Sequence, residues 1–249
     1  MTKFVDLHCH ILPYVDDGAF RTKESERLLD MLYFQGARSI CVTPHLRHRM
    51  FETPDEEILV QFDELQAYAA QRSYPVHLFL SREYHCDTRL QACLESGTVR
   101  PLGEGNSILI EFSQLHDFAT ILEWVARVRT NGYQPLIAHV ERYPGLDGSL
   151  DRASELIQNG ALLQMNASSV LGREGLRQAR WSKKLLKESL IHVIASDAHD
   201  SMERPPLLDA CHRYLRKKVG DAYADALMRD NPMQIISTTE KENNSHADN

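Results

Sequence analysis

Two histidines near the start of the chain have the spacing of metal ligands. His8 and His10 close an apolar run, Phe4–Cys9, that has the character of a strand. Side chains alternate along a strand, so both imidazoles point the same way and can reach one ion. Two histidines this close also arise by chance, so the pair indicates a metal site only together with other ligands.

Seven more side chains of ligand type follow strand-like runs further along the chain. Each closes an apolar run or follows one closely: Asp17, His45, Glu83, Glu111, His139, Asp197 and His199. Buried carboxylates without partners are costly, so a cluster of this kind needs cations. Neighbouring metal ions can share a water, lower its pKa and hold phosphoryl oxygens. The pattern therefore predicts a multi-metal hydrolytic centre.

Alternating strand and helix patterns must position these residues. Seven short apolar runs predict parallel strands covered on both faces: Phe4–Cys9, Arg38–Thr43, Val76–Leu80, Ser107–Phe112, Pro135–His139, Ala161–Met165 and Ile191–Ala195. Helical patterns lie between most of them, at Thr22–Gln35, Glu57–Gln71, Phe118–Asn131, Leu150–Asn159, Gly175–Glu188, Leu207–Val219 and Tyr223–Asp230.

This alternation predicts a single α/β domain over residues 1–239, a TIM-like (β/α) barrel with its site at the carboxyl ends of the strands. An open doubly wound sheet is the alternative, but no Gly-x-Gly-x-x-Gly or P-loop pattern follows any strand. The polar segment 240–249 is expected to be disordered.

Composition excludes several other classes of protein. A net charge of −7 over 249 residues argues against a nucleic-acid partner. No apolar run approaches the roughly 20 residues that a membrane helix needs, so membrane insertion is not expected. The five cysteines form no Cys-x-x-Cys pair, which is typical of free thiols in a reducing compartment. We therefore expect a cytoplasmic protein.

The ligand-bearing segments resemble the polymerase and histidinol phosphatase (PHP) family. More closely, they resemble its branch of manganese-dependent protein-tyrosine phosphatases, which are encoded with bacterial capsule and exopolysaccharide genes. The stretches that carry the likeness are Asp6-Leu7-His8-Cys9-His10-Ile11-Leu12-Pro13, Val15-Asp16-Asp17-Gly18, Met50-Phe51-Glu52-Thr53-Pro54, 137–143, 192–199 and 203–206. They follow one another in order along nearly the whole chain. The resemblance implies a distorted seven-stranded barrel.

The resemblance also implies a trinuclear site for three divalent ions, Mn²⁺ first, with Fe and Zn²⁺ as alternatives. The implied ligands are His8, His10, Glu83 and Asp197 for one ion, Glu83 as a bridge to a second ion held by Glu111 and His139, and Asp17, His45 and His199 for the third. Arg142 and Arg204 match the positions that grip the phosphate. One departure is Ser81-Arg82 before Glu83, where the family has small residues, so Arg82 puts the placement of Glu83 in question.

The activity implied by the resemblance is hydrolysis of phosphotyrosine on an autophosphorylated bacterial tyrosine kinase that controls capsule or exopolysaccharide synthesis. A metal-bound hydroxide is expected to attack phosphorus in line, while the arginines neutralise the developing charge. Asp16, Glu141 and Asp200 are candidates to protonate the leaving phenolate. A small-molecule phosphatase of the histidinol-phosphate type and a non-catalytic metal-binding scaffold stay open as alternatives.

A second phosphatase pattern occurs in the segment Cys41-Val42-Thr43-Pro44-His45-Leu46-Arg47. It fits the Cys-x5-Arg loop of cysteine-dependent tyrosine phosphatases, in which backbone N–H groups cradle phosphate. Pro44 has no N–H, however, and no glycine permits the tight loop. We interpret the match as coincidence. After the sixth strand-like run, Asn166, Ser168 and Ser169 are placed to hydrogen-bond the ligands.

Overall fold

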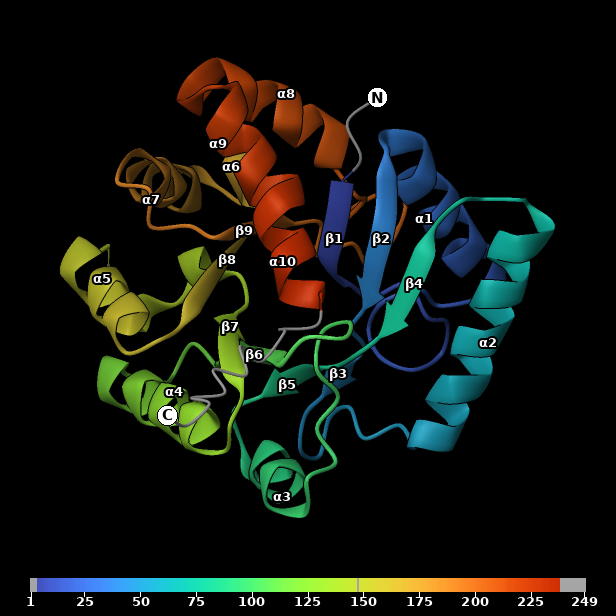
Figure 1. Ribbon diagram of the computed structural model, residues 1–249, viewed down its shortest axis with the longest axis horizontal. Coiled ribbons are helices and arrows are strands. Elements are labelled where there is room, and N and C mark those ends of the chain that lie inside the picture. The colour runs from blue at the N-terminus through green and yellow to red at the C-terminus, as the bar shows by residue number, and fades with distance from the viewer. Residues whose placement is uncertain (1–3, 147, 238–249) are drawn as a thin grey trace, which may run out of the picture.

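Two parallel sheets form the centre of the computed structural model, which describes residues 4–146 and 148–237. The first sheet has the order β1 (Phe4–Cys9), β2 (Ala37–Val42) and β4 (His77–Leu80). The second has the order β3 (His45–Leu46), β5 (Glu83–His85), β6 (Ser107–Glu111), β7 (Gln134–Ile137), β8 (Leu162–Asn166) and β9 (Val193–Ala195). Figure 1 shows the strands arranged around a common centre, with most helices outside them. The fold is α/β with a curled parallel sheet.

The second and third predicted strands each continue, after a break, as a short strand of the other sheet. Thr43 and Pro44 separate β2 from β3, and Ser81 and Arg82 separate β4 from β5. β2 pairs with β4, and β3 pairs with β5, so both strands leave the first sheet together. Pro44 cannot donate a ladder hydrogen bond, which favours a break there.

The two sheets meet again where β9 passes β1. Cys9 forms an isolated bridge with Ala198, and the backbone N–H of Asp197 donates to the His8 carbonyl oxygen at 2.8 Å. The order of neighbours is that of a barrel, but the described residues form nine strands in two sheets instead of the expected seven in one. A complete seven-stranded barrel is therefore not confirmed.

Ten α-helices within the described residues connect and cover the strands. They are α1 (Thr22–Gln35), α2 (Asp55–Gln71), α3 (Thr88–Ser96), α4 (Phe118–Thr130), α5 (Leu150–Gln158), α6 (Ala167–Val170), α7 (Leu176–Lys187), α8 (Leu208–Val219), α9 (Asp221–Asp225) and α10 (Asn231–Ile236). Short 3₁₀-helices, η1 (Val140–Arg142) and η2 (Pro144–Leu146), follow β7, and a π-helical turn, η3 (Ala226–Asp230), follows α9. The sequence predicted six of the α-helices to within about two residues at each end, but not α3, α6 or α10, and its predicted helix Tyr223–Asp230 covers the end of α9 and the whole of η3.

An inner apolar cluster fills the space enclosed by the strands. Val5, Leu109, Leu136 and Val193 contribute to it from four strands, and Ile236 of α10 packs into it. Gly103 lies against this helix with a φ of +60°, and a Cβ placed there would come within 2.6 Å of the Ile236 Cβ. The helix thus closes one end of the enclosed space, the end opposite the polar residues described next.

Two predictions concern the chain as a whole. None of the helices in 4–146 and 148–237 is long and apolar enough to cross a membrane. The expected disordered tail, 240–249, and the boundary at residue 239 lie outside the described residues, so the domain limits stay a prediction.

Candidate metal centre

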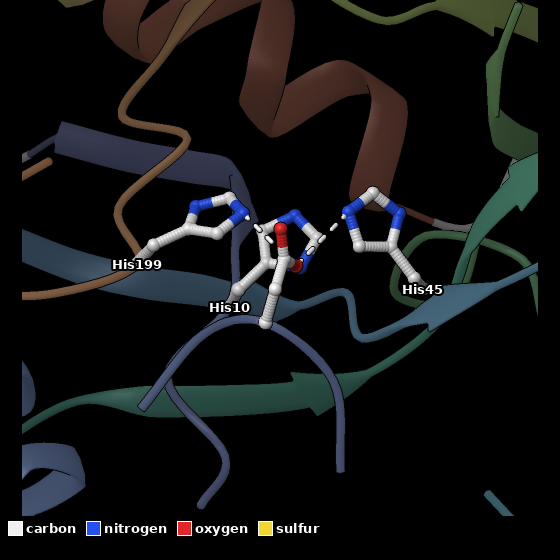
Figure 2. Close-up of side chains that lie close together, drawn as sticks. His10, His45 and His199 are labelled. Atoms are coloured by element: carbon white, nitrogen blue, oxygen red, sulfur yellow. Dashed lines mark ion pairs between the residues drawn. The ribbon is translucent and has the colours of Figure 1, made fainter. Parts of the chain in front are cut away.

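All nine predicted ligands gather at the carboxyl ends of the strands. Eight of them form three groups, and within each group one nitrogen or oxygen atom from each residue lies within 4.8 Å of the others. The groups are His8, His10 and Asp197; His45, Glu83 and Glu111; and His10, Asp17, His45 and His199. Figure 2 shows the imidazoles of His10, His45 and His199 gathered from separate segments of the chain. His139 is in none of these groups, but its Nε2 lies 2.9 Å from Glu83 Oε1.

His45 lies between two groups of ligands that the implied assignment kept apart. Its Nδ1 is 3.1 Å from Glu83 Oε2 and 3.3 Å from Glu111 Oε1, while its Nε2 is 3.4 Å from Asp17 Oδ1. The implied assignment used His45 only beside Asp17 and His199. The geometry supports the first implied set more directly, because Glu83 Oε2 lies 3.1 Å from Nε2 of both His8 and His10.

Backbone conformation turns two of these side chains into the cluster. His139 lies two residues after the end of β7 and has a φ of 32°, and Asp197 lies two residues after the end of β9 and has a φ of 52°. Residues with a Cβ seldom adopt this left-handed region, and such strain persists where surrounding contacts enforce it. For His139, the backbone N–H donates to Gln164 Oε1 at 2.7 Å.

A buried amide fixes the orientation of His8. Gln164 is fully buried, and its Oε1 accepts from His8 Nδ1 at 3.2 Å as well as from the His139 backbone. The Gln164 amide nitrogen then donates to Asn166, whose own amide donates to Asp197 Oδ2 at 2.6 Å. The network holds the Nδ1 proton on His8 and leaves Nε2 for an ion.

Two other histidines are oriented in the same way. His10 Nδ1 donates to Asp16 Oδ2 at 2.8 Å, and His199 Nδ1 donates to the Asp197 carbonyl oxygen at 2.9 Å. Burial is the main cause that lowers the pKa of His199 to about 4, so this imidazole is neutral at pH 7. In both residues Nδ1 is engaged in a hydrogen bond, so Nε2 is the atom that faces the cluster and is left to bind an ion.

Three buried polar atoms of the cluster lack a hydrogen-bond partner within the described part of the chain. They are His45 Nδ1, Glu83 Oε2 and His199 Nε2. Buried polar atoms are nearly always satisfied, and an unsatisfied one costs free energy. A divalent cation is the partner that imidazole nitrogens and carboxylate oxygens share, so these residues fit a metal centre.

The carboxylates of the cluster are held in the charged form. Burial by itself raises the pKa of Glu83, but the charges of His8 and His45 together with other imidazole contacts hold it well below its usual range. Burial acts in the same direction on Glu111, where contacts with His45 and His85 nevertheless lower the pKa to about 2. Both groups can therefore bind cations at neutral pH.

Arg142 and Arg204 meet at one oxygen of Asp197. Arg142 Nη1 lies 3.1 Å and Arg204 Nη2 lies 3.0 Å from Asp197 Oδ2, while Asp197 Oδ1 faces the histidines. Arg142 also makes a bidentate pair with Glu174, at 2.7 and 2.9 Å, and Ser168 hydrogen-bonds the same carboxylate. Sequence reasoning missed Glu174, because nothing in the local pattern separates it from a surface glutamate.

The three candidate proton donors are each engaged in other contacts. Asp16 is tied to His10, and Asp200 accepts the backbone N–H groups of Met202 and Glu203 in a turn. Glu141 is buried and accepts from the Asn166 backbone. None of the three lines the cleft over the metal cluster among the described residues. Asp16 acts as the group that orients His10.

A cleft of about 390 Å³ lies over the cluster, and its outer wall is the segment after β3. Arg47, Met50 and Phe51 line it, and the Phe51 ring stacks on His45 at a centroid distance of 5.0 Å. Arg82 is buried behind this wall, where its guanidinium donates to the carbonyl oxygens of His45 and Thr53 at 3.2 Å. Arg82 thus anchors the wall and does not displace Glu83.

Cys41 belongs to the inner apolar cluster and is fully buried. Burial raises the pKa of its thiol well above the ordinary value, which is the opposite of what a nucleophile needs. Residues 43 and 44 also place Cys41 and His45 in different strands, so the segment does not form one phosphate-binding loop. The Cys-x5-Arg match is therefore a coincidence.

We expect Cys41→Ser to keep most of the turnover on an aryl phosphate, since the thiol touches no part of the cleft. His139→Ala and Asp197→Ala should lose nearly all of it, because each removes a side chain of the cluster. Steady-state assays of the three purified variants test this. A Cys41→Ser protein that is folded and metal-loaded yet inactive would contradict it.

We expect Gln164→Leu to weaken metal binding roughly 10- to 100-fold, the usual effect of removing a hydrogen bond behind a ligand. The substitution leaves His8 Nδ1 and the His139 backbone N–H without their shared acceptor. Titration of Mn²⁺ against a fluorescent chelator measures the change. Gln61→Leu on α2 is the matched control, because its buried side-chain oxygen has no hydrogen-bond partner in the described chain. Equal Mn²⁺ affinity in the two variants would refute the role of Gln164.

Comparison with known proteins yields relatives over nearly the whole chain. A family model described as capsular polysaccharide synthesis, CpsB/CapC, matches residues 4–237. The tyrosine-protein phosphatase CpsB of Streptococcus pneumoniae is 33% identical over 237 residues, which are 93% of this chain and 98% of that protein.

Solved structures agree with these relatives. One described as YwqE from Bacillus subtilis and CpsB from Streptococcus pneumoniae, unique metal-dependent tyrosine phosphatases, matches with a TM-score of 0.85 and 27% identity, over 93% of this chain and 94% of that one. Histidinol phosphate phosphatase from Lactococcus lactis matches with a TM-score of 0.56 and 14% identity, over 89% and 94%. This second likeness concerns the fold alone.

Proposed function

Because the chain belongs to the CpsB/CapC family of capsular polysaccharide synthesis, we propose that it is a metal-dependent tyrosine-protein phosphatase. The observation that carries this function is the cluster at the strand ends, where imidazole nitrogens and carboxylate oxygens face one cleft beside two arginines. The relatives indicate the substrate class, and the geometry provides side chains that can bind metal ions and phosphate.

We propose that the three groups of side chains hold three divalent ions, with Mn²⁺ as the first candidate and Fe or Zn²⁺ as alternatives. Mixed imidazole and carboxylate donors suit all three metals. The proposed ligands are the nine residues of the cluster, with Glu83 in contact with two groups and His45 shared between the second and the third. Ions held there would activate a water and bind phosphoryl oxygens.

Arg142 and Arg204 are proposed to bind the phosphate of the substrate. Their guanidinium groups converge at the edge of the metal cluster and line the cleft with it. Guanidinium groups bind phosphate oxygens with two parallel hydrogen bonds, which lysine cannot do. Glu174 positions Arg142 for this contact through its bidentate pair, while Arg204 is the more exposed of the two.

The cleft suits an aryl phosphate that is attached to a protein chain. Phe51, Met50 and Phe112 provide apolar lining beside the polar floor, and Met50 is 58% exposed at the mouth. We propose an autophosphorylated bacterial tyrosine kinase of capsule or exopolysaccharide synthesis as the substrate. A cytoplasmic location stays a prediction. The histidinol-phosphate alternative has only a likeness of fold behind it.

A substrate panel tests the function directly. Metal-stripped protein should be inactive, and Mn²⁺ should restore hydrolysis of phosphotyrosine peptides with a higher kcat/KM than that of phosphoserine peptides, histidinol phosphate or single-stranded DNA. Elemental analysis confirms the metal content in each arm. A clear preference for histidinol phosphate would overturn the tyrosine-phosphatase assignment. Full activity without metal would overturn the metal centre.

We expect Arg204→Ala to lower kcat/KM roughly 100-fold with unchanged metal content and melting temperature, because it removes a charged contact to the phosphate. Arg142→Ala should lower the melting temperature as well, since it leaves Glu174 without its bidentate partner. Kinetics, thermal unfolding and elemental analysis of both variants make the comparison. A normal kcat/KM in Arg204→Ala would exclude it from phosphate binding.

A further inference from the structure

Helix α7 and the residues before it are strongly basic in an acidic chain. Residues 173–187 contain six Lys or Arg and one Glu, whereas the whole chain has a net charge of −7. The single acidic residue, Glu174, is already paired with Arg142. Trp181 and Leu185 are 7% and 0% exposed and fix the inner face of the helix, so the basic side chains lie on its outer face.

Four of these basic residues form a line that we call the basic stripe: Arg173, Arg177, Arg180 and Lys184. Arg177, Arg180 and Lys184 are spaced by three and four residues within α7, which places them on one face of the helix, and Arg173 lies three residues before it. All four are exposed. Within the described chain, Arg180 and Lys184 have no carboxylate partner, whereas Arg213, Arg216 and Arg229 are each paired with an aspartate. The positive charges of Arg180 and Lys184 are therefore available to a ligand.

The basic stripe adjoins the metal cleft through two neighbouring hollows. One, of about 320 Å³, shares Arg142, Asp197 and Arg204 with the metal cleft and has Arg173 in its lining. The other, of about 260 Å³, has Arg177, Arg180 and Lys184 in its lining, together with the buried Glu141 and with Tyr143, which also lines the metal cleft. The proposed phosphate-binding arginines thus lie beside the start of the stripe.

We propose that the basic stripe binds an acidic segment that flanks the phosphotyrosine in the protein substrate. This inference rests on the proposed function, because only a protein substrate extends beyond the metal cleft. Arg177 and Lys184 are seven positions apart on the helix, about 10 Å at 1.5 Å per residue, which an extended peptide covers in about three residues. Carboxylates or further phosphates within a few residues of the phosphotyrosine would meet these side chains.

Charge at the rim of an interface acts mainly on encounter and selectivity and is screened by salt. The stripe should therefore lower KM for acidic substrates at low ionic strength and leave the chemical step unchanged. A merely solvated basic helix would have no such selectivity.

The test uses two phosphotyrosine peptides that are identical except for glutamate or glutamine at the flanking positions on both sides. p-Nitrophenyl phosphate serves as a substrate that cannot reach the stripe. The variant is Arg180→Gln with Lys184→Gln, and the matched control is Lys217→Gln with Lys218→Gln, which removes the same charge from exposed positions of α8. Glutamine has a helix propensity close to that of both residues, so the helices should persist.

We expect the stripe variant to raise KM for the glutamate peptide roughly three- to tenfold at low salt. Its kcat for the glutamate peptide should stay at the wild-type value, and so should its kcat and KM for the glutamine peptide and for p-nitrophenyl phosphate. The control variant should keep the wild-type kcat and KM on all three substrates. Equal KM values for the two peptides in the wild type, or an equal rise of KM in the control variant, would overturn this inference and leave the proposed function intact.

Two further outcomes are also decisive. Stripe-dependent sedimentation with phosphatidylglycerol vesicles, together with unchanged peptide KM, would overturn the inference in favour of a membrane surface. Failure of the metal-loaded wild type to hydrolyse either phosphotyrosine peptide would overturn the proposed function itself.

Discussion

The carboxylate of Glu83 is the point on which the arrangement of the site depends. Its Oε2 lies 3.1 Å from an imidazole nitrogen of each of His8, His10 and His45, and its Oε1 lies 2.9 Å from His139. A carboxylate with a side chain 1% exposed cannot be left unpaired without a large cost. Strands far apart in the sequence must therefore end at one place, and the departure of β3 and β5 from the first sheet brings His45 and Glu83 there.

A buried shell of polar groups keeps these contacts in register. Gln164 connects His8 to the His139 backbone, while Asp16 accepts from both His10 and the backbone N–H of His45. Beneath them, Asp6 accepts from the Ser196 backbone and hydroxyl, which fixes β1 against the segment that carries Asp197. Because these partners are side chains locked by packing, the cluster is held in shape by the protein itself, as an efficient metal site requires.

The sequence predicted the strand ends and the ligand types because both have local patterns. Apolar runs followed by His, Asp or Glu predicted the nine residues that the structure brings together, while Arg142 and Arg204, which the resemblance added, lie beside them. β3 and β5 were missed, since strands of two and three residues show no periodicity. Gln164 and Glu174 were missed for another reason. Their partners lie 156 and 32 residues away, and no local pattern encodes such a contact. The sharing of His45 between two groups was also missed, because it depends on the three-dimensional position of the side chain, which no local pattern encodes.

Closure of the inner cluster by Ile236 has a consequence for the order of events during synthesis. β1 is made first, yet its Asp6 binds a residue 190 positions later, and the enclosed apolar space is filled only when α10 arrives. Contacts of this sequence separation form late and make folding slow. A ribosome-bound chain therefore exposes the histidines of its first segment for most of translation, before Asp197 and His199 are made. The complete set of ligands therefore exists only in the released and folded protein. The correct metal must then compete with any ions that the first histidines bound during synthesis.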